Sequence, residues 1–412
     1  MKNIKVVIGS NFGDEGKGLM TDYFCSKFPE NKPVLNVRFN GGAQAGHTVI
    51  APDGRRHVFG HFGAGSFNPN VATYLGPDFI VNPILFKKEY DKLMALGVYP
   101  MVFVHPRCLL TMPQDMMVNQ FIEMRRGTTR HGSCGVGVYE TILRSKVARP
   151  IHVKDMKYAE PRFQIDIGYY NDERIQKIFG FKLANEEMKL LSNQNIKAHF
   201  DQDLKFFMDH VSVTDETIFD KYDNIVFEGA QGLMLDQNNI DYFPHLTPSN
   251  TGIQNVLKYF SNEDNESVEV CYVTRTYLTR HGAGKLPNEC TMAEAGAKVD
   301  LTNHENEWQG SLRYGKLDIS KVNNRTIKDF MKVGEFCLTL PCDVERTIAL
   351  THSDCEENFK RIFYDAMEER KNGEIPIHYT SVGPFRHNVY DYGSLFYDLI
   401  TERRFKPYGT NN

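Results

Sequence analysis

The sequence lacks the features that mark zinc-binding, secreted and membrane-spanning proteins. Its eight cysteines form no Cys-x-x-Cys pair, which argues against a zinc ribbon and against a disulfide framework. The N-terminus, MKNIKVVIGS, has neither the apolar core nor the cleavage site of a secretory signal. No stretch approaches the roughly 18 apolar residues of a membrane span. We therefore expect a cytoplasmic protein with reduced thiols.

The chain also lacks a strong net charge and any obvious linker. Its formal net charge is -4 over 412 residues, so it has no basic field of the kind that sequence-independent nucleic-acid binding requires. No internal repeat, low-complexity tract or Pro/Ser-rich linker divides it. We expect one domain over residues 1–412, in which the segment from about 100 to 220 forms a helical subdomain.

Short apolar runs rich in β-branched residues alternate with longer helical patterns. The runs are IKVVIGS, PVLNVRFN, NIVFEGA, VEVCYVTRTYL and EFCLTLP. Between them, PILFKKEYDKLMALG and EEMKLLSNQNIKAHFDQDLKFFMDHV place apolar residues near helical spacing. The alternation is typical of α/β proteins. It predicts a large, mostly parallel central sheet with helices on both faces and long active-site loops.

The first predicted strand runs directly into a glycine-rich turn, GSNFGDEGKG (residues 9–18), and a helical pattern follows. Such a turn at a helix N-terminus offers backbone N–H groups to phosphate oxygens, and Lys17 adds a positive charge. The Walker pattern does not fit, because Asn11 stands where that motif has glycine and no Ser or Thr follows Lys17. The carboxylates of Asp14 and Glu15 would repel a phosphate unless one binds Mg²⁺ or takes a proton.

A second glycine-rich segment, NGGAQAGHT (residues 40–48), ends the next predicted strand. In a doubly wound sheet this strand end lies at the same carboxyl edge as the first, which is where ligands bind. Small residues around His47 leave room for a substrate. Taken alone, His47 is compatible with a structural role as well as a catalytic one, and both stay open.

Together, the segments GDEGKG, NGGAQAGHT and FEGAQG (residues 227–232) resemble the adenylosuccinate synthetase family in order and spacing. Four further runs are similar to family segments: HFGAGSFNPNVATYLGPDFIVNP, DYFPHLTPSNT (residues 241–251), TRHGAGKLP (residues 279–287) and TSVGPFRHNV (residues 380–389). The resemblance spans nearly the whole chain. It implies a ligase that joins L-aspartate to C6 of a 6-oxopurine nucleotide, IMP to adenylosuccinate, with hydrolysis of a nucleoside triphosphate through a 6-phosphoryl intermediate.

The resemblance also implies roles for residues of the first two segments. Asp14 would take the proton from N1 of the purine and ligate Mg²⁺, His47 would be the acid that stabilises charge on O6, and Lys17 would neutralise the phosphates. The Gly46 carbonyl would complete the metal shell. The physical logic stands independently, because a carbonyl oxygen is a poor leaving group and needs a carboxylate, a cation and Mg²⁺ acting together.

Other site residues follow from the resemblance, position by position. The substrate contacts would be Gln44, Ser133, Cys134, Gln231, Thr247, Arg280, Ser311 and Arg313. The triphosphate contacts would be Gly13, Glu15, Gly16, Lys17, Gly18, Gly46, His47, Thr48, Asp343, Ser381, Gly383 and Pro384. The family further implies a homodimer in which an arginine reaches into the partner's nucleotide site, and both Arg144 and Arg149 are candidates for that arginine.

Four departures from the family pattern bear on the substrates. Gln44 stands where the family usually has Asn. The phosphate loop GSCGVGVYE (residues 132–140) is shortened and lacks the family's arginine, and WQGSLRYG (residues 308–315) replaces an arginine-rich aspartate loop. The family reads guanine with a Thr-Lys-x-Asp run after a late strand, whereas FCLTLPCD (residues 336–343) lacks the Lys and places Asp343 one position late. This last departure predicts that ATP supports the reaction at least comparably to GTP.

Two alternatives to the IMP-directed ligase stay open. One is the family branch of phage enzymes that act on (d)GMP to give 2-amino-(deoxy)adenylosuccinate and that use adenine triphosphates. That branch often has Ser in place of the loop Asp, whereas this chain keeps Asp14. The other is a non-catalytic nucleotide-binding relative, and the presence of Asp14, Lys17 and His47 argues against it.

Overall fold

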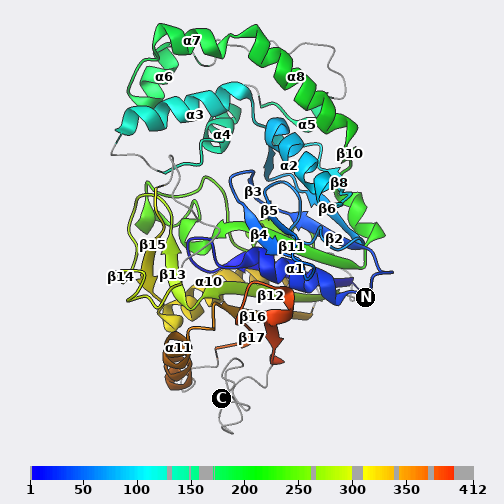
Figure 1. Ribbon diagram of the computed structural model, residues 1–412, viewed down its shortest axis with the longest axis vertical. Helices are drawn as coiled ribbons and strands as arrows, with labels where there is room; N and C mark the ends of the chain where they lie inside the picture. Colours follow the sequence, from blue (N-terminus) through cyan, green and yellow to red (C-terminus); the bar gives the residue numbers. More distant parts are fainter. Residues whose placement is uncertain are drawn as a thin grey trace.

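A 10-stranded sheet forms the centre of the computed structural model, which describes residues 2–127, 132–147, 150–156, 170, 172–260, 266–298, 310–337, 343–369 and 375–393 (Figure 1). In order across the sheet, its strands are β10 (Ser212–Val213), β8 (Met101–Val104), β6 (Val71–Leu75), β2 (Val34–Arg38), β11 (Asn224–Gly232), β1 (Lys2–Gly9), β12 (Glu266–Arg275), β16 (Asp343–Thr351), β17 (Ile377–Ser381) and β18 (Val389–Asp391). Neighbouring strands pair in parallel except β17 and β18. The prediction of a mostly parallel sheet is confirmed.

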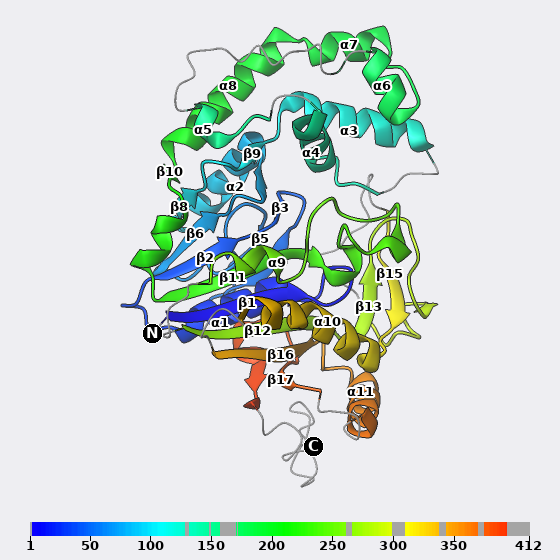
Figure 2. The same ribbon diagram turned by 180° about the vertical axis from the view of Figure 1, so that it is seen from behind.

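Helices cover both faces of this sheet, as predicted. Helix α1 (Lys17–Lys27) lies in front of the sheet in Figure 1, and α10 (Ile319–Cys337) lies on the opposite face, in front in Figure 2. Side chains alternate along β1, so Val6 packs in the apolar cluster that includes residues of α10, and Val7 packs with Met20 of α1. Both faces of the strand are therefore buried, which explains its continuous apolar run.

A mostly helical segment lies above the sheet in Figures 1 and 2. Its helices are α3 (Pro113–Arg126), α4 (Val138–Val147), α5 (Val153–Met156), α6 (Asp172–Phe179), α7 (Asn185–Leu191) and α8 (Gln194–Asp209). Val118 and Ile122 of α3 share a separate apolar cluster with Ile175 and Leu191. Phe207 of α8 packs instead in the cluster that borders the sheet. The single-domain boundary over residues 1–412 stays a prediction.

Smaller elements complete the described chain. The remaining described α-helices are α2 (Pro83–Ala95), α9 (Gln254–Leu257) and α11 (Glu356–Glu369), and short 3-10 helices lie at Glu216–Lys221, Leu233–Leu235, Ile240–Tyr242 and Arg386–Asn388. There are three small sheets. In the first, β15 (Arg313–Lys316) lies between β13 (Tyr277–Arg280) and β14 (Glu289–Cys290); in the second, β7 (Phe79–Val81) lies between β3 (Gly41–Gly42) and β9 (Leu109–Leu110); in the third, β4 (His47–Ile50) pairs with β5 (Arg56–Phe59). None of the described helices is long and apolar enough to cross a membrane.

The strand predicted at residues 336–339 is wrong in the part that the structure describes. Phe336 and Cys337 end α10, and Asp343 begins β16, where it pairs with Ser267 of β12. Residues 338–342 lie outside the described chain. Helix α10 extends to Cys337, and a short apolar run cannot be assigned to strand or helix by its composition alone. Asp343 therefore lies at the amino edge of the sheet, opposite the edge that carries the glycine-rich loops.

Candidate active site

The turn after β1 is built around the Glu15 side chain. Gly13 and Gly16 have φ values of 99° and 93°, which favour glycine, and Asp14 has a φ of 53°, in the left-handed region that Asp tolerates better than most residues. The backbone N–H of Asn11 donates to Glu15 Oε1 at 2.6 Å, and burial raises the Glu15 pKa to about 7. The structure thus places the Glu15 carboxylate under the turn, and the carboxylate is not among the groups that line the cavity described below.

Asp14 faces the cavity from the same turn. Its backbone carbonyl accepts a hydrogen bond from Nε of Arg275, at the end of β12. Its carboxylate Oδ2 lies 3.3 Å from Nε2 of His281, and 29% of its side chain is exposed. A partly exposed carboxylate on a fixed backbone suits a base that must meet a substrate proton.

His47 belongs to a buried network with Glu228 and Arg38. Its Nδ1 pairs with Glu228 Oε1, and Arg38 Nη1 donates to the same oxygen at 3.0 Å. Parallel pairing of β2 with β11 sets Arg38 beside Glu228. The N–H of Ala64 donates to Glu228 Oε2 at 2.9 Å. Every buried charge in this network therefore has a partner, as buried ionic groups require.

Burial and neighbouring cations set the protonation of this network. Burial lowers the His47 pKa to about 4, against the opposing effect of its hydrogen bond to Glu228. Burial would raise the Glu228 pKa, but Arg38 and His47 outweigh it and hold that pKa at about 2. Burial also lowers the Lys17 pKa, while nearby carboxylates oppose the change. In the free protein His47 is neutral, and its Nδ1–H, assigned from the pairing, donates to Glu228.

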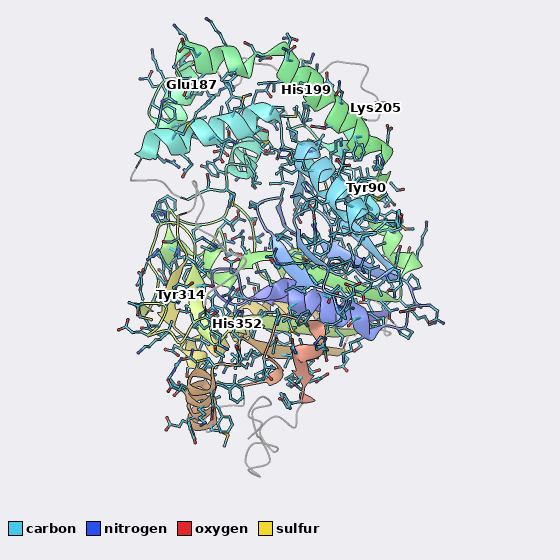
Figure 3. The ribbon with its side chains drawn as sticks, in the orientation of Figure 1. Tyr90, Glu187, His199, Lys205, Tyr314 and His352 are labelled. Carbon is cyan, nitrogen blue, oxygen red and sulfur yellow. The ribbon has the colours of Figure 1, made fainter. Side chains whose placement is uncertain are left out.

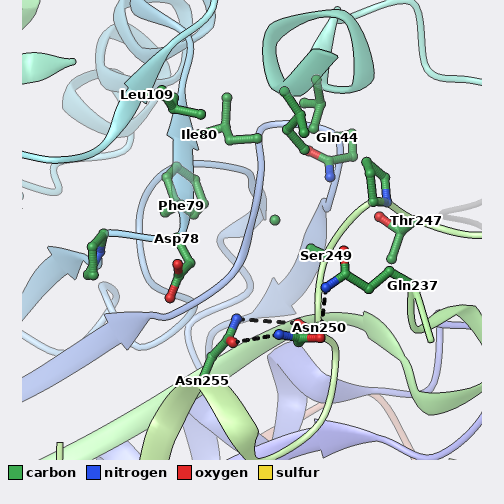
Figure 4. A pocket seen from close by; sticks show the side chains of 15 residues that line it. Gln44, Asp78, Phe79, Ile80, Leu109, Gln237, Thr247, Ser249, Asn250 and Asn255 are labelled. Atoms are coloured by element: carbon green, nitrogen blue, oxygen red, sulfur yellow. Dashed lines mark hydrogen bonds between the residues drawn. The ribbon is translucent and has the colours of Figure 1, made fainter. Parts of the chain in front are cut away.

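A cavity of about 740 Å³ brings many of the predicted residues together. Those that line it are Gly13, Asp14, Lys17, Gln44, Gly46, His47, Ser133, Cys134, Gln231, Thr247 and Arg280. They come from loops at the carboxyl edge of the sheet and from the helical segment that faces it. A smaller cavity of about 210 Å³ adjoins it through Gln44 and Thr247 (Figure 4). Its wall carries Asn250 and Asn255, whose side chains are hydrogen-bonded to each other at 3.2 Å.

The loop at residues 132–140, predicted to bind a phosphate group, lines the cavity on the side of the helical segment. Ser133 Oγ donates to Asn119 Oδ1 at 3.2 Å, and Cys134 Sγ donates to the Gln44 carbonyl at 3.8 Å. Burial raises the Cys134 pKa to about 12, so this side chain is a thiol and a weak donor. The loop thus contacts the NGGAQAGHT segment directly. This contact brings together Cys134 and Gln44, which were both predicted to bind the nucleotide substrate.

Of the two arginines predicted to bind substrate, the structure brings one into the cavity. Arg280 lies over the Phe12 ring at 4.7 Å, and burial lowers its pKa only to about 10, so it stays cationic. Arg313 instead pairs with both carboxylate oxygens of Glu289, at 2.7 and 2.6 Å. Neither Arg313 nor Ser311 lines the cavity.

Arg144, one of the two arginines predicted to cross to a partner, is engaged within its own subunit. Its Nε and Nη2 donate to both oxygens of Asp115 at 2.9 Å, and its Nη2 donates to the Leu110 carbonyl. The guanidinium is buried inside its own subunit, where this bidentate pair satisfies Asp115. Arg149 lies outside the described residues and remains the candidate.

A loop that the sequence analysis missed follows β16. Residues 351–354 read Thr-His-Ser-Asp, so the family's Thr-x-x-Asp spacing occurs here, with His352 in the place of Lys (Figure 3). Thr351 Oγ1 donates to the Glu15 carbonyl at 2.9 Å, and the Ser353 N–H donates to the Ser381 carbonyl at 2.8 Å. The signal was present in the strand-like run TIALTHSD, which keeps the Thr-x-x-Asp spacing, whereas FCLTLPCD places its Asp one position late.

The remaining predicted triphosphate contacts lie beside this loop or beside His47. Ser381 ends β17, and its Oγ donates to the Gly383 carbonyl at 2.7 Å, directly before Pro384. A Cβ at Gly18 would lie 3.0 Å from the Thr48 carbonyl, so α1 and the His47 segment approach closely. The structure thus groups these residues at one edge of the sheet, whereas Asp343 lies at the other.

Comparison with known proteins agrees with this geometry. The family model for adenylosuccinate synthetase matches residues 6–344. The chain belongs to the adenylosuccinate synthetase family. Members of this family are ligases that form a C–N bond between aspartate and a purine nucleotide, and the chain is an enzyme of that class.

Curated relatives in the adenylosuccinate synthetase family come from diverse organisms. The adenylosuccinate synthetase of Lactobacillus helveticus is 30% identical over 306 residues, which is 73% of this chain and 68% of the relative. That of Acaryochloris marina is 27% identical over 364 residues, which is 83% of this chain and 78% of the relative.

Two solved structures share the fold. The fully ligated adenylosuccinate synthetase from Plasmodium falciparum has a TM-score of 0.65 at 18% identity, covering 94% of this chain and 99% of that one. The succinoaminodeoxyadenylate synthetase of cyanophage S-2L, bound to dGMP and dATP, has a TM-score of 0.60 at 16% identity, covering 95% of each chain. At such identities the likeness is one of fold.

Proposed function

We propose that this enzyme converts IMP and L-aspartate to adenylosuccinate with GTP and Mg²⁺. The γ-phosphoryl group of GTP is transferred to O6 of IMP as the N1 proton leaves. The aspartate amine then attacks C6, and the C6–O6 bond breaks to release phosphate. The observation that carries this proposal is the position of Asp14, Lys17 and His47, which come from two loops of the sheet and line one cavity.

In this proposal each residue acts from the contacts described above. Asp14 takes the N1 proton, since its carboxylate is partly exposed while its backbone is tied to Arg275. His47 is neutral in the free protein, and phosphate groups brought by the substrates favour its protonation, because they add negative charge beside a buried imidazole. The imidazolium, held by Glu228, then stabilises the negative charge that develops on O6.

The protein oxygen ligands predicted for the metal are few, which fits a Mg²⁺ ion bound largely by the phosphates of the substrates. No group of three His, Cys, Asp or Glu side chains within the described residues forms a metal cage. Mg²⁺ commonly binds one or two carboxylates together with substrate phosphates, and Asp14 and Gly46, the two predicted metal ligands, line the same cavity. The bound ion would supply neutralisation of charge on the transferred phosphoryl group.

We assign guanine recognition to Asp354 and no longer to Asp343. Guanine presents two donors, N1–H and the 2-amino group, that a carboxylate accepts with charge-assisted hydrogen bonds, whereas adenine lacks this pair. Asp354 lies in the loop after β16, next to the loop that begins at Ser381. Its carboxylate pairs with Lys298. The earlier expectation of relaxed triphosphate choice rested on Asp343, so its basis is lost.

A homodimer and a cytoplasmic location complete the proposal. Both are family expectations. Arg149 would be the residue that crosses to the partner, because Arg144 is engaged with Asp115.

The substrates are tested by combining IMP, GMP and dGMP with GTP and ATP, and by detecting the succinylated product by mass spectrometry. We expect product from IMP with GTP. Product mainly from GMP or dGMP would assign the chain to the 2-aminopurine branch, whose cyanophage member shares this fold. Triphosphate hydrolysis that does not depend on aspartate would contradict the ligase assignment.

A further inference from the structure

We propose that His281 is a positioning residue for Asp14, and that the chemical step depends on their contact. The inference rests on the proposed function, because that function makes Asp14 the base. The family run Thr-Arg-x-Gly-Ala-Gly leaves the position of His281 unspecified, so the resemblance gives this side chain no role.

The two side chains meet at the wall of the large cavity. His281 Nε2 lies 3.3 Å from Asp14 Oδ2, and both residues line the cavity. Only 16% of the His281 side chain is exposed, so the surrounding residues confine its ring. At this separation the two atoms can pair, and the ring nitrogen is the one of the two that can carry a proton to donate to a carboxylate.

The loop that carries His281 is tied to the neighbouring strand. Gly282 and Gly284 have φ values of 68° and 103°, which allow the chain to turn sharply after His281. Arg313 Nη1 donates to the carbonyls of both glycines, at 3.1 and 2.7 Å. Arg313, which does not line the cavity, therefore acts on the site indirectly by fixing this loop.

Asp14 is held at two separate points. Arg275 binds its backbone carbonyl, and His281 lies against one oxygen of its carboxylate. Because its backbone and one carboxylate oxygen are both held, the Asp14 side chain has a restricted orientation from which to accept the N1 proton. Catalytic groups need such support, since a misplacement of about 1 Å costs on the order of 100-fold in rate.

The test compares two substitutions that differ in hydrogen-bonding ability. His281→Leu removes the donor, and we expect kcat to fall about 10- to 100-fold while KM for IMP changes less than about threefold. His281→Gln keeps an N–H donor on a side chain of similar length, and we expect it to restore most of kcat. His210→Leu is the matched control, since His210, which directly follows α8, is half-buried against Tyr90 and Phe206 and lies outside the cavity.

A second measurement does not depend on turnover. Long-range ¹H–¹⁵N spectra of histidine-labelled protein should show His281 protonated at Nε2, with slower solvent exchange in the wild type than in Asp14→Ala. The inference is overturned if His281→Leu keeps kcat within about twofold, if Gln restores no more than Leu, or if Asp14→Ala leaves the ring signal unchanged. Failure of the wild type to ligate any substrate pair would count against the proposed function, and the spectra would still decide whether the contact exists.

Discussion

Single residues in this site act through neighbours that are far away in the sequence. The buried His47, Glu228 and Arg38 form one unit, in which Glu228 is ionised because Arg38 and His47 compensate for its burial. A charge left without its partner in such a place costs several kcal/mol, so the network fixes the ring of His47 as well as its tautomer.

Asp14→Ala should abolish ligation and leave folding intact. The side chain is partly exposed and adds little to the core, but it supplies the base and a metal contact in the proposed reaction. We expect a rate loss of at least about 100-fold at unchanged melting temperature, measured by product formation and by calorimetry. A variant that keeps more than about a tenth of the wild-type rate would remove Asp14 from the mechanism.

At the level of elements, we expect the loop that follows β16 to set the choice of triphosphate. Asp354 follows its carboxyl end, and Asp343 begins its amino end. We predict that kcat/KM for GTP exceeds that for ATP by about 100-fold, the ratio expected from roughly 3 kcal/mol of base recognition. Asp354→Ala should abolish this preference, whereas the matched variant Asp343→Ala should keep it. If the two variants behave in the opposite way, the assignment to Asp354 is wrong.

Helices α3 and α4 provide a prediction about pH. Burial raises the pKa of Glu140 on α4 to about 7, while a hydrogen bond from Asn119 of α3 opposes the shift. The folded state binds this proton more tightly than the unfolded state does. Its contribution to stability is therefore complete below pH 4.5, the ordinary pKa, and is lost as the pH rises through 7.

Glu140→Gln, which mimics the neutral acid, should remove that pH dependence. Urea unfolding should be measured at pH 4.5 and at pH 8. As the pH rises, the unfolding free energy of the wild type should fall relative to that of the variant. The scale is about 1.4 kcal/mol per pKa unit. A difference that is the same at both pH values would contradict the raised pKa.

The sequence predicted those elements whose signals are local and repeated. Glycine-rich turns after β1 and β2 were recognisable because glycine is needed where φ is positive, as at Gly13 and Gly16. The end of α10 was not recognisable from the sequence, because a short apolar run fits a helix or a strand equally well. The contact between Asp14 and His281 could not be predicted either, since it depends on how β1 and β13 lie in space.

At the scale of the whole molecule, the parallel sheet gathers residues from nearly the entire chain at one edge. The cavity combines the ends of β1, β2, β11 and β13 with a wall from the helical segment, and the loops after β16 and β17 lie beside the turn that follows β1. We expect the active form to be a dimer in which Arg149 completes the partner's site.

Arg144 and Arg149 should therefore respond differently to substitution. Arg144→Ala leaves Asp115 buried without this partner and should destabilise the fold by about 3–5 kcal/mol. Arg149→Ala should keep its melting temperature and lose activity. Mixing Arg149→Ala with Asp14→Ala subunits should restore activity, since each hybrid dimer holds one complete site. A fully active monomer in sedimentation, or no recovery on mixing, would contradict the shared site.

The central claim is that O6 of the purine is phosphorylated before aspartate displaces it. In that sequence of bonds, O6 leaves with the phosphate. Turnover of IMP labelled with ¹⁸O at position 6, in the presence of GTP, Mg²⁺ and L-aspartate, should place the label in the released inorganic phosphate, one atom for each adenylosuccinate formed. Unlabelled phosphate together with labelled water would show that the phosphoryl group never reached O6, and would contradict the mechanism assigned to Asp14 and His47.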